Sequence, residues 1–334
     1  MTNLSRFPNP QTKSLSTAFI TFDSMIRLSM ISLLITCWMC SSAFAQPSAL
    51  NKANRIQLSA KEDTLLSLSL KLNTDSIQAI RMKADSQFTR VLVRALQIPY
   101  SFWYSFDSLI GISKLYAPDS SFRIFTWNLS YDDYYHRQRG TIQMRTKDGS
   151  LKMYPLRDVS EFIENATDSA RDRMNWIGAA YYNMIKTQHQ GKSFYTLFGF
   201  DPNGAMSSMK WMEVLHFNAK GEPVFGGPFF SYENDATRKP TQYRYQLEFK
   251  KNAQVLLNFI PDLNMVLVDH LISENNDPDN KWTYIPDGDQ EGFTWKNGKW
   301  IHVEKVFTQI LQEGEAPREI PILEQKSNQK VKGQ

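Results

Sequence analysis

Cysteine is almost absent from this chain of 334 residues, and its two cysteines, Cys37 and Cys40, both lie near the N-terminus. They sit inside an apolar stretch that has the features of a cleaved export signal. The mature chain would then contain no cysteine. Disulfides, thiol nucleophiles and cysteine metal sites would all be excluded from it.

The chain also lacks a large excess of charge of one sign. Lys plus Arg number 38 and Asp plus Glu number 34, which gives a formal charge of +4. Proteins that bind nucleic acid carry clustered basic surface, because their partner is a polyanion. The balance therefore gives no reason to expect a nucleic acid partner. The hydrophobic share of 42% is enough for a sizeable core, which excludes wholesale disorder.

Standard catalytic motifs are missing as well. The chain has no Gly-x-Ser-x-Gly elbow, phosphate-binding glycine loop, dinucleotide fingerprint or His-Glu-x-x-His pair. Their absence makes an enzyme less expected without excluding one. No stretch after residue 45 is apolar for 18 residues, so we expect no membrane span in the mature chain.

Residues 1–45 are predicted to be a signal peptide, with Met25 as an alternative start. Arg27 provides a positive start, an apolar stretch of about 13 residues follows, and Ala43-Phe44-Ala45 places small residues where a signal peptidase reads. The stretch is short for a hydrocarbon core of ~30 Å, so a membrane anchor is the less favoured alternative. Lipidation at Cys37 is a second alternative. It is also less favoured, because Thr36 is larger than the residue that usually precedes a lipidated cysteine. We expect export to the periplasm or the cell exterior.

The mature protein should begin at Gln46, since the predicted cleavage follows Ala45. N-terminal sequencing or intact mass of protein extracted from the cell envelope measures this directly. A mature form that retains Cys37 would contradict the prediction. A lipid-modified cysteine would instead indicate an anchored protein.

The remaining sequence predicts an α+β fold: an N-terminal amphipathic helix, then a mostly antiparallel β-meander, a sandwich or open barrel, with one intervening helix. Residues 46–73 are expected to be a polar lead-in, 74–306 a single domain, and 307–334 a mobile tail in which Ile320–Leu323 could dock. The first helix begins at Thr74 or Asp75 and ends before Pro99, with apolar residues three or four positions apart. The second is expected over 168–187. No repeat of fixed period supports a propeller.

Strands account for most of the rest. We expect them at 122–129, 141–146, 151–154, 194–200, 209–217, 223–232, 241–250, 254–260, 264–271 and 299–306. The turn at Lys147-Asp148-Gly149 indicates a hairpin. In the 241–250 strand, Tyr243, Tyr245, Leu247 and Phe249 alternate with Arg244 and other polar residues, which predicts one buried and one solvated face.

Several aromatic and glycine-rich segments in the last third of the chain resemble a family of uncharacterised exported bacterial proteins. They are Tyr195–Asp201, Pro223–Phe229, Asp269–Leu271 and Tyr284–Phe293. The resemblance implies export and a β-rich domain, and it implies no activity, substrate or catalytic residue.

The segment around residue 131 is the main candidate for ligand contact. Tyrosines and an arginine beside acids are typical of clefts that hold sugars or peptides. The candidate ligand-binding residues are Tyr131, Tyr134, Tyr135 and Arg137, and the candidate catalytic residues are Asp132, Asp133, His136 and Asp269. Packing within a sheet is the favoured alternative for such aromatics.

Metal candidates come from two places. An acid-rich stretch offers oxygen ligands of the kind that calcium prefers, although its spacing matches no EF-hand: Asp277, Asp279, Asp287, Asp289 and Glu291. His302 and Glu304 lie two apart, which on a strand places both on one face. Solvated loop charge and a structural histidine are the favoured alternatives, so no cofactor is expected, with calcium kept open.

Two functions follow from these observations. The favoured one is a non-catalytic, exported ligand-binding or interaction module of the cell envelope, with an envelope ligand or protein as partner. The alternative is an envelope hydrolase that acts on a glycan or peptide through paired carboxylates, with Asp132, Asp133 and Asp269 as candidates. Convergence of acids and histidines in one pocket would favour the enzyme.

Overall fold

A computed structural model describes residues 50–237 and 239–307. The expected signal peptide, both cysteines and the expected tail after Phe307 lie outside these residues. No helix within the described ranges is long and apolar enough to cross a membrane.

Two antiparallel helices open the described chain, α2 (Lys52–Thr74) and α3 (Gln78–Leu96). Helix α3 lies within the range that the sequence analysis gave to the first helix and begins a few residues after Asp75. Helix α2 replaces most of the expected polar lead-in. The Asn51 side chain caps it by accepting the N–H of Asn54 at 2.7 Å, which satisfies a free donor of the first turn. Its buried side is a narrow leucine stripe: Leu58, Leu65, Leu68 and Leu72.

Three sheets follow in the described residues, all antiparallel except for the short parallel pair of β10 with β15, and we name each by its place. The helix-side sheet has the order β1 (Ser113–Tyr116), β2 (Phe122–Ser130), β3 (His136–Met144), β4 (Lys152–Arg157). The central sheet has the order β5 (Arg171–Asp172), β9 (Pro223–Phe225), β8 (Ser207–Phe217), β7 (Lys192–Asp201), β6 (Ala180–His189), and β11 (Arg244–Lys250) also pairs with β8. The outer sheet has the order β10 (Phe230–Ser231), β15 (Lys299–Val303), β14 (Tyr284–Lys296), β13 (Met265–Ser273), β12 (Leu257–Ile260).

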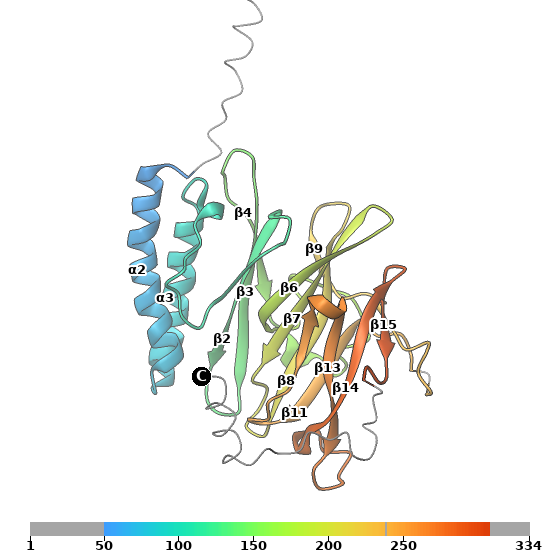
Figure 1. Ribbon diagram of the computed structural model, residues 1–334. Helices are drawn as coiled ribbons and strands as arrows, with labels where there is room; N and C mark the ends of the chain where they lie inside the picture. Colours follow the sequence, from blue (N-terminus) through green and yellow to red (C-terminus); the bar gives the residue numbers. More distant parts are fainter. Residues whose placement is uncertain (1–49, 238, 308–334) are drawn as a thin grey trace, which may run out of the picture. The chain divides into compact units, whose positions relative to one another are not determined.

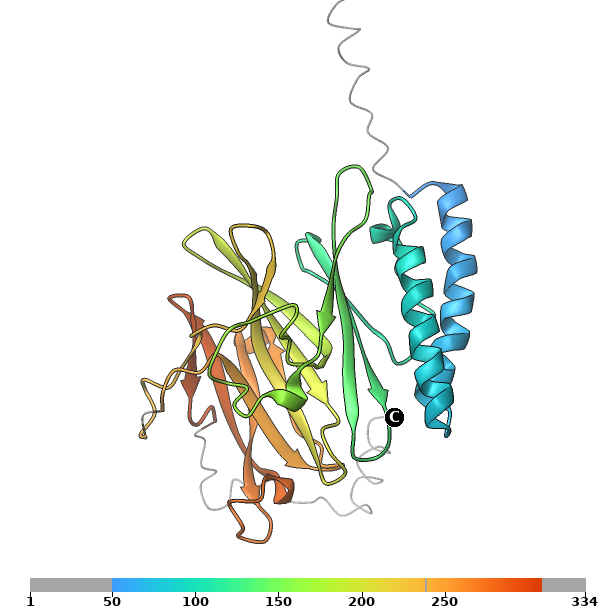
Figure 2. The same ribbon diagram turned by 180° about the vertical axis from the view of Figure 1, so that it is seen from behind.

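Three apolar cores hold the described layers together. The helices lie against one face of the helix-side sheet (Figures 1 and 2). Phe125 and Trp127 belong to the core on this face. The other face of that sheet packs on the central sheet around Trp176. Central and outer sheets meet around Phe198 and Trp300. The prediction of a β-rich α+β fold with antiparallel sheets is therefore confirmed, and the sheets stack as in a sandwich with three layers instead of two.

The intervening helix expected over 168–187 is wrong. Its residues form β5, a loop and β6, which pairs with β7 from Ala180 to His189. The apolar residues 174, 177, 181, 182 and 185 fit a helical period by chance. The stronger local signal was the turn Gln190-Gly191, where both residues have positive φ (48° and 73°), as in tight hairpin turns.

Two further segments differ from expectation. The predicted strand 223–232 is broken, because Gly226 adopts φ +79° and the chain leaves the central sheet at β9 to enter the outer sheet at β10. Residues 284–296, read as part of an acidic loop, form the longest strand, β14. Asp287 and Asp289 are exposed where the register with β13 shifts, whereas Glu291 is half-buried and pairs with Val268.

The alternation predicted for β11 is half correct. Tyr245 and Leu247 pack on the core between central and outer sheets, and Phe249 is buried. Arg244, expected in solvent, is fully buried. The second face of β11 is covered at that point, because Arg244 hydrogen-bonds to carbonyls of the segment 166–169.

Candidate functional site

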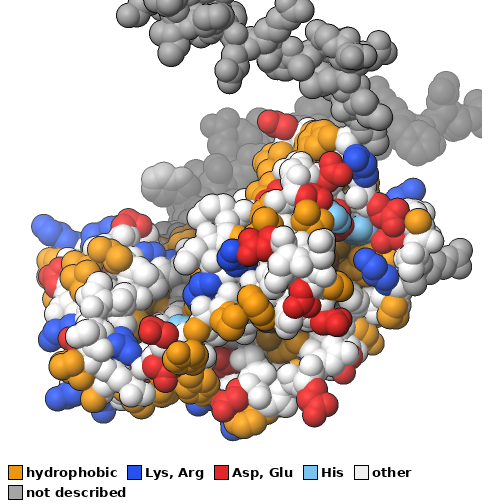
Figure 3. Space-filling model, turned by 90° about the horizontal axis from the view of Figure 1, so that it is seen from below, with side chains coloured by type: hydrophobic (Ala, Val, Ile, Leu, Met, Phe, Trp, Pro, Cys, Tyr) orange, Lys and Arg blue, Asp and Glu red, His pale blue; other side chains and the backbone are white. Residues whose placement is uncertain are grey.

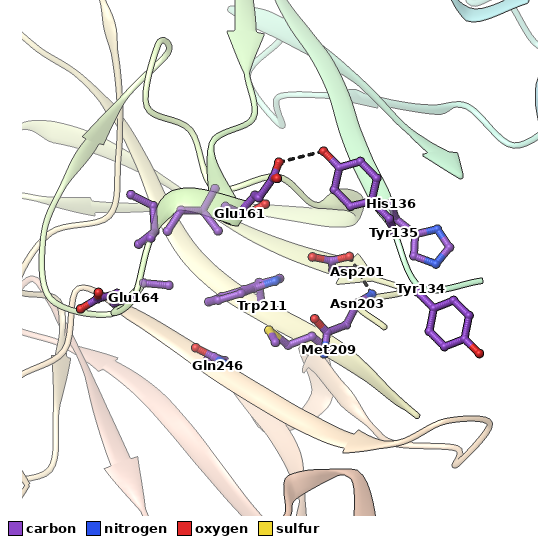
Figure 4. Close-up of a pocket in the computed structure, with 14 residues that line it drawn as sticks. Tyr134, Tyr135, His136, Glu161, Glu164, Asp201, Asn203, Met209, Trp211 and Gln246 are labelled. Carbon is purple, nitrogen blue, oxygen red and sulfur yellow. Dashed lines mark hydrogen bonds between the residues drawn. The ribbon is translucent and has the colours of Figure 1, made fainter. Parts of the chain in front are cut away.

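A cleft of about 400 Å³ opens between the helix-side and central sheets (Figure 4). We call it the Trp211 cleft. It is lined by Tyr134, Tyr135, His136, Ser160, Glu161, Ile163, Glu164, Ala166, Ile177, Asp201, Asn203, Met209, Trp211 and Gln246. Its volume lies at the lower end of the range of ligand cavities, ~300–1,000 Å³.

Strand register builds the floor of the cleft. Asp201 of β7 is opposite Met209 of β8, and Trp211 is opposite both Gly199 of β7 and Gln246 of β11. Cross-strand partners share a face, and so do residues two apart, so the floor residues all face the helix-side sheet. Gly199 leaves room for this packing, because a Cβ there would lie 2.6 Å from the Cβ of Ala179.

One wall is the loop between β2 and β3. The Asp132 side chain accepts the N–H groups of Tyr134 and Tyr135 at 2.8 and 2.7 Å, which fixes a tight turn. The Tyr135 hydroxyl then donates to Glu161 across the cleft at 2.8 Å. The Tyr134 ring is 76% exposed at the mouth.

The opposite wall is the segment 158–166, which Asp158 anchors. Its carboxylate accepts from the backbone N–H groups of Gln138, Ser160 and Gly178 and from the Ser160 hydroxyl, at 2.7–3.2 Å. Four donors satisfy the buried carboxylate. Asp158 is therefore a structural residue that positions Glu161 and Glu164 at the cleft.

Two nitrogens at the cleft have no hydrogen-bond partner among residues 50–237 and 239–307. They are Nε1 of Trp211, a side chain only 4% exposed, and Nε2 of His136. Burial lowers the pKa of His136, and its Nδ1 lies 2.9 Å from the Ser130 hydroxyl. An unpaired buried donor costs ~1–3 kcal/mol, so the indole N–H is available to an acceptor that enters the cleft.

Asp201 is the most perturbed acid of the cleft. Burial is the main reason that its pKa is raised to about 6. The nearby charge of Asp158 also raises the pKa, whereas hydrogen bonds from Asn203 and Gln138 lower it. The backbone N–H of Asn203 and the side chain of Gln138 both donate to Oδ1, at 2.9 and 3.3 Å. Figure 4 shows Asp201 on the side of the cleft toward which the Trp211 nitrogen points.

The cleft is acidic. Glu161, Glu164 and Asp201 line it, and no Lys or Arg is among its lining residues. The positive charge of Lys251 lowers the pKa of Asp201, and its Nζ donates to the carbonyls of Pro202 and Gly204 at 2.7 and 2.9 Å.

The predicted ligand and catalytic residues are only partly brought together. Tyr134, Tyr135 and His136 line the Trp211 cleft. Tyr131, Asp132 and Asp133, with His136, line a second, more open hollow beside the turn between α2 and α3. Arg137 donates to the carbonyl of Asp158 at 3.3 Å.

Asp269 lies in another layer. It is on β13 of the outer sheet, where its carboxylate accepts the N–H of Leu256 at 2.7 Å and the Gln290 amide at 3.3 Å. The loop with Asp132 and Asp133 belongs to the helix-side sheet. The structure therefore does not bring the proposed paired carboxylates together.

Most of the metal candidates make separate contacts. Asp277 accepts from Asn280, Asp289 pairs with Lys305 at 3.0 Å, Glu304 accepts the N–H of Ala236 at 2.9 Å, and Asp279 is exposed. Two candidates do meet, because Glu291 contacts His302 at 3.1 Å. Glu291 also lies 3.8 Å from His270, which pairs with Asp287 at 2.8 Å. Within the described part of the chain, no group of three or more His, Cys, Asp or Glu is arranged to hold a metal ion. On the face seen in Figure 3, acidic and basic side chains are interspersed.

His302 is instead the centre of a buried ionic cluster. Its Nδ1 lies 2.9 Å from the Asp235 carboxylate and its Nε2 lies 3.1 Å from Glu291. Burial lowers the pKa of His302, but hydrogen bonds to Glu291 and Asp235 outweigh burial and leave the pKa raised. The imidazolium is therefore the form that the fold favours.

We expect His302 to make stability depend on pH. Because the folded pKa lies above the unfolded value of ~6.5, the stabilisation is fully present below that pH and is lost as pH rises through the folded pKa. Urea unfolding between pH 5.5 and 9 should show a falling free energy for the natural protein and a flatter curve for His302→Gln. His189→Gln, at the β6–β7 turn, is the control. If the free energy of unfolding changes equally with pH in all three proteins, the prediction is contradicted.

The cleft residues that the sequence did not identify as site candidates are Asp201, Trp211, Glu161 and Gln246. Asp201 entered the sequence analysis only as the end of the segment Tyr195–Asp201, and Trp211 only as part of the strand predicted over 209–217. Comparison with family models, with curated proteins and with solved structures found no match to this chain. The resemblance to exported bacterial proteins stays a prediction.

Proposed function

We propose that this protein is an exported, non-catalytic ligand-binding module of the cell envelope, and that its ligand occupies the Trp211 cleft. The observation that carries the proposal is the Trp211 indole N–H, buried and without a partner among the described residues. A native fold rarely leaves such a donor unpaired, and a ligand acceptor would satisfy it. The concave shape and the mixture of aromatic and polar lining residues agree with a ligand site.

The test is to fill the cleft. Ala166 lines it, and Ala166→Phe would occupy its volume. Ala219→Phe, in the exposed β8–β9 turn, is the matched control. Calorimetric titration with maltose, cellobiose, spermidine, glutamate and citrate should find a compound that binds the natural protein and the control but not Ala166→Phe. Binding that survives Ala166→Phe, or no binding by any of the five, would contradict the proposal.

Hydrolysis in the same cleft is the second candidate, because the pKa of Asp201, about 6, suits a proton donor near neutral pH. Glu161 and Glu164 are further carboxylates that line the cleft. Release of nitrophenol from nitrophenyl glycosides, abolished by Asp201→Asn, would support this function. No turnover by a protein that binds saccharides would favour the binding module.

A further inference from the structure

The lining of the Trp211 cleft contains both a hydrogen-bond donor and hydrogen-bond acceptors, so a matching ligand must accept and donate at neighbouring positions. Trp211 Nε1 can only donate, whereas the carboxylates of Asp201 and Glu161 accept when ionised. Trp211 lies on the same face as Asp201, and one residue pair, Phe200–Lys210, separates their two pairs in the ladder of β7 and β8. A hydroxyl group both accepts and donates, so a ligand with adjacent hydroxyls matches both sides of the floor.

The charge of the lining restricts the ligand further. An anion would meet Glu161, Glu164 and Asp201 with no lining Lys or Arg to offset them. An ammonium ligand would suit the acids, but it has no lone pair for the buried Trp211 N–H. A neutral ligand avoids both penalties.

The mouth of the cleft offers flat apolar faces. The Tyr134 ring is exposed there, and the Tyr135 hydroxyl is held by Glu161, which orients its ring at the wall. Rings of this kind pack against the C–H face of a cyclic ligand. Gln246 completes the floor with an amide that both donates and accepts.

We infer that the Trp211 cleft binds a neutral saccharide, with one hydroxyl accepting from Trp211 Nε1, neighbouring hydroxyls donating to Asp201 and Glu161, and a ring face against Tyr134. This inference rests on the proposed function, since it names the class of ligand that the same cleft takes.

The experiment compares the binding of saccharides and of other ligand classes to variants that each carry one substitution. Maltose and cellobiose are the saccharide probes, and spermidine and citrate represent cations and anions. Trp211→Phe removes the N–H and keeps most of the ring, so saccharide affinity should fall roughly tenfold. Trp282→Phe, at a site 38% exposed and outside the cleft, should leave affinity unchanged.

Tyr134→Ala gives a second variant that does not depend on the core, because Tyr134 is 76% exposed. It should weaken binding of the cyclic disaccharides and leave binding of the open-chain polyol sorbitol unchanged, since only a ring presents a flat face. A saccharide that binds equally well to the natural protein, Trp211→Phe and Tyr134→Ala would overturn the inference.

Failure of this inference can be told from failure of the proposed function. If neither disaccharide binds but spermidine or citrate binds and is lost in Ala166→Phe, the cleft is a ligand site of another class and the saccharide inference is wrong. If no probe binds in a manner that Ala166→Phe prevents, both are wrong.

Discussion

Replacing Arg244 with methionine should lower the free energy of unfolding by about 3–5 kcal/mol, because it leaves a buried charge without its partner. Arg244 is 0% exposed, and its Nε donates to Glu213 at 2.8 Å. Its remaining donors hold the carbonyls of Ala166, Ser169 and Phe225, all at 2.8 Å. Glu213, 1% exposed, would keep only its hydrogen bond from the Tyr181 hydroxyl.

Urea unfolding of Arg244→Met measures this loss, and Lys250→Met on the same strand is the control. Lys250 pairs with Glu274 in solvent, so its substitution should cost less than ~1 kcal/mol. The double variant Glu213→Met with Arg244→Met should be more stable than Arg244→Met alone, since it removes both charges. Equal losses at Arg244 and Lys250 would contradict the buried ion pair.

The position of Arg244 links this ion pair to the candidate site. Its Nη1 donates to the carbonyl of Ala166, and the Ala166 side chain lines the Trp211 cleft. The Arg244 guanidinium thus supports this wall of the cleft at Ala166, while Asp158 anchors the other end of the same segment. A folded Arg244→Met protein should accordingly bind the cleft ligand less tightly than Lys250→Met.

The sequence predicted which face of β11 packs on the core between the central and outer sheets. It could not predict what covers the other face. Alternation is a local property, so Tyr245 and Leu247 were readable from spacing alone. Arg244 is buried by a segment about 75 residues earlier in the chain, which comes close only through the tertiary fold. The same reasoning explains why most strands of the sheets were predicted but their stacking was not.

The errors in the helices have opposite causes. Residues 52–74 carry many polar side chains, so their composition indicated a loose segment, although leucines seven apart at 58, 65 and 72 mark a buried stripe. Residues 180–189 fit a helical period, but pairing with β7 satisfies their backbone groups within a sheet. Tertiary pairing outweighs such a weak local period.

The candidate site divides in the same way. Tyr134, Tyr135 and His136 are neighbours in the sequence, so their local composition sufficed to identify one wall. Asp201, Trp211 and Gln246 come from three strands and meet only through the register of β7, β8 and β11. No spacing rule relates them, because register depends on which strands pair.

Arg123 is the second residue at which we expect a large loss of stability. It is 1% exposed on β2, and among residues 50–237 and 239–307 no carboxylate pairs with it. Burial lowers its pKa to about 10, so the side chain still carries its charge at neutral pH. Its guanidinium donates to the Gln143 amide, the Tyr116 hydroxyl and the Ser101 carbonyl at 2.8 Å, and to the Tyr104 carbonyl.

Aromatic rings replace the missing counterion. The guanidinium carbon lies 4.7–5.7 Å from the ring centres of Phe125, Phe106, Tyr116 and Phe102. Such rings attract a cation through their negative faces. Arg123 therefore fastens the segment that connects the helices to the first sheet, because Ser101 and Tyr104 both belong to it.

We expect Arg123→Ala to lower the free energy of unfolding by about 3–5 kcal/mol, since it opens a cavity and leaves several buried acceptors unpaired. Arg123→Lys should cost about 1–3 kcal/mol, because an ammonium keeps the charge but cannot reproduce a planar fork of five donors. Arg145→Ala is the matched control: Arg145 lies over the Trp103 ring at 5.9 Å but is exposed, so the loss should stay below ~1 kcal/mol. Urea unfolding measures all three losses, provided that the dependence of the unfolding free energy on urea concentration is the same in each variant. If Arg123→Lys is as stable as the natural protein, charge alone holds the segment and the fork of hydrogen bonds adds nothing.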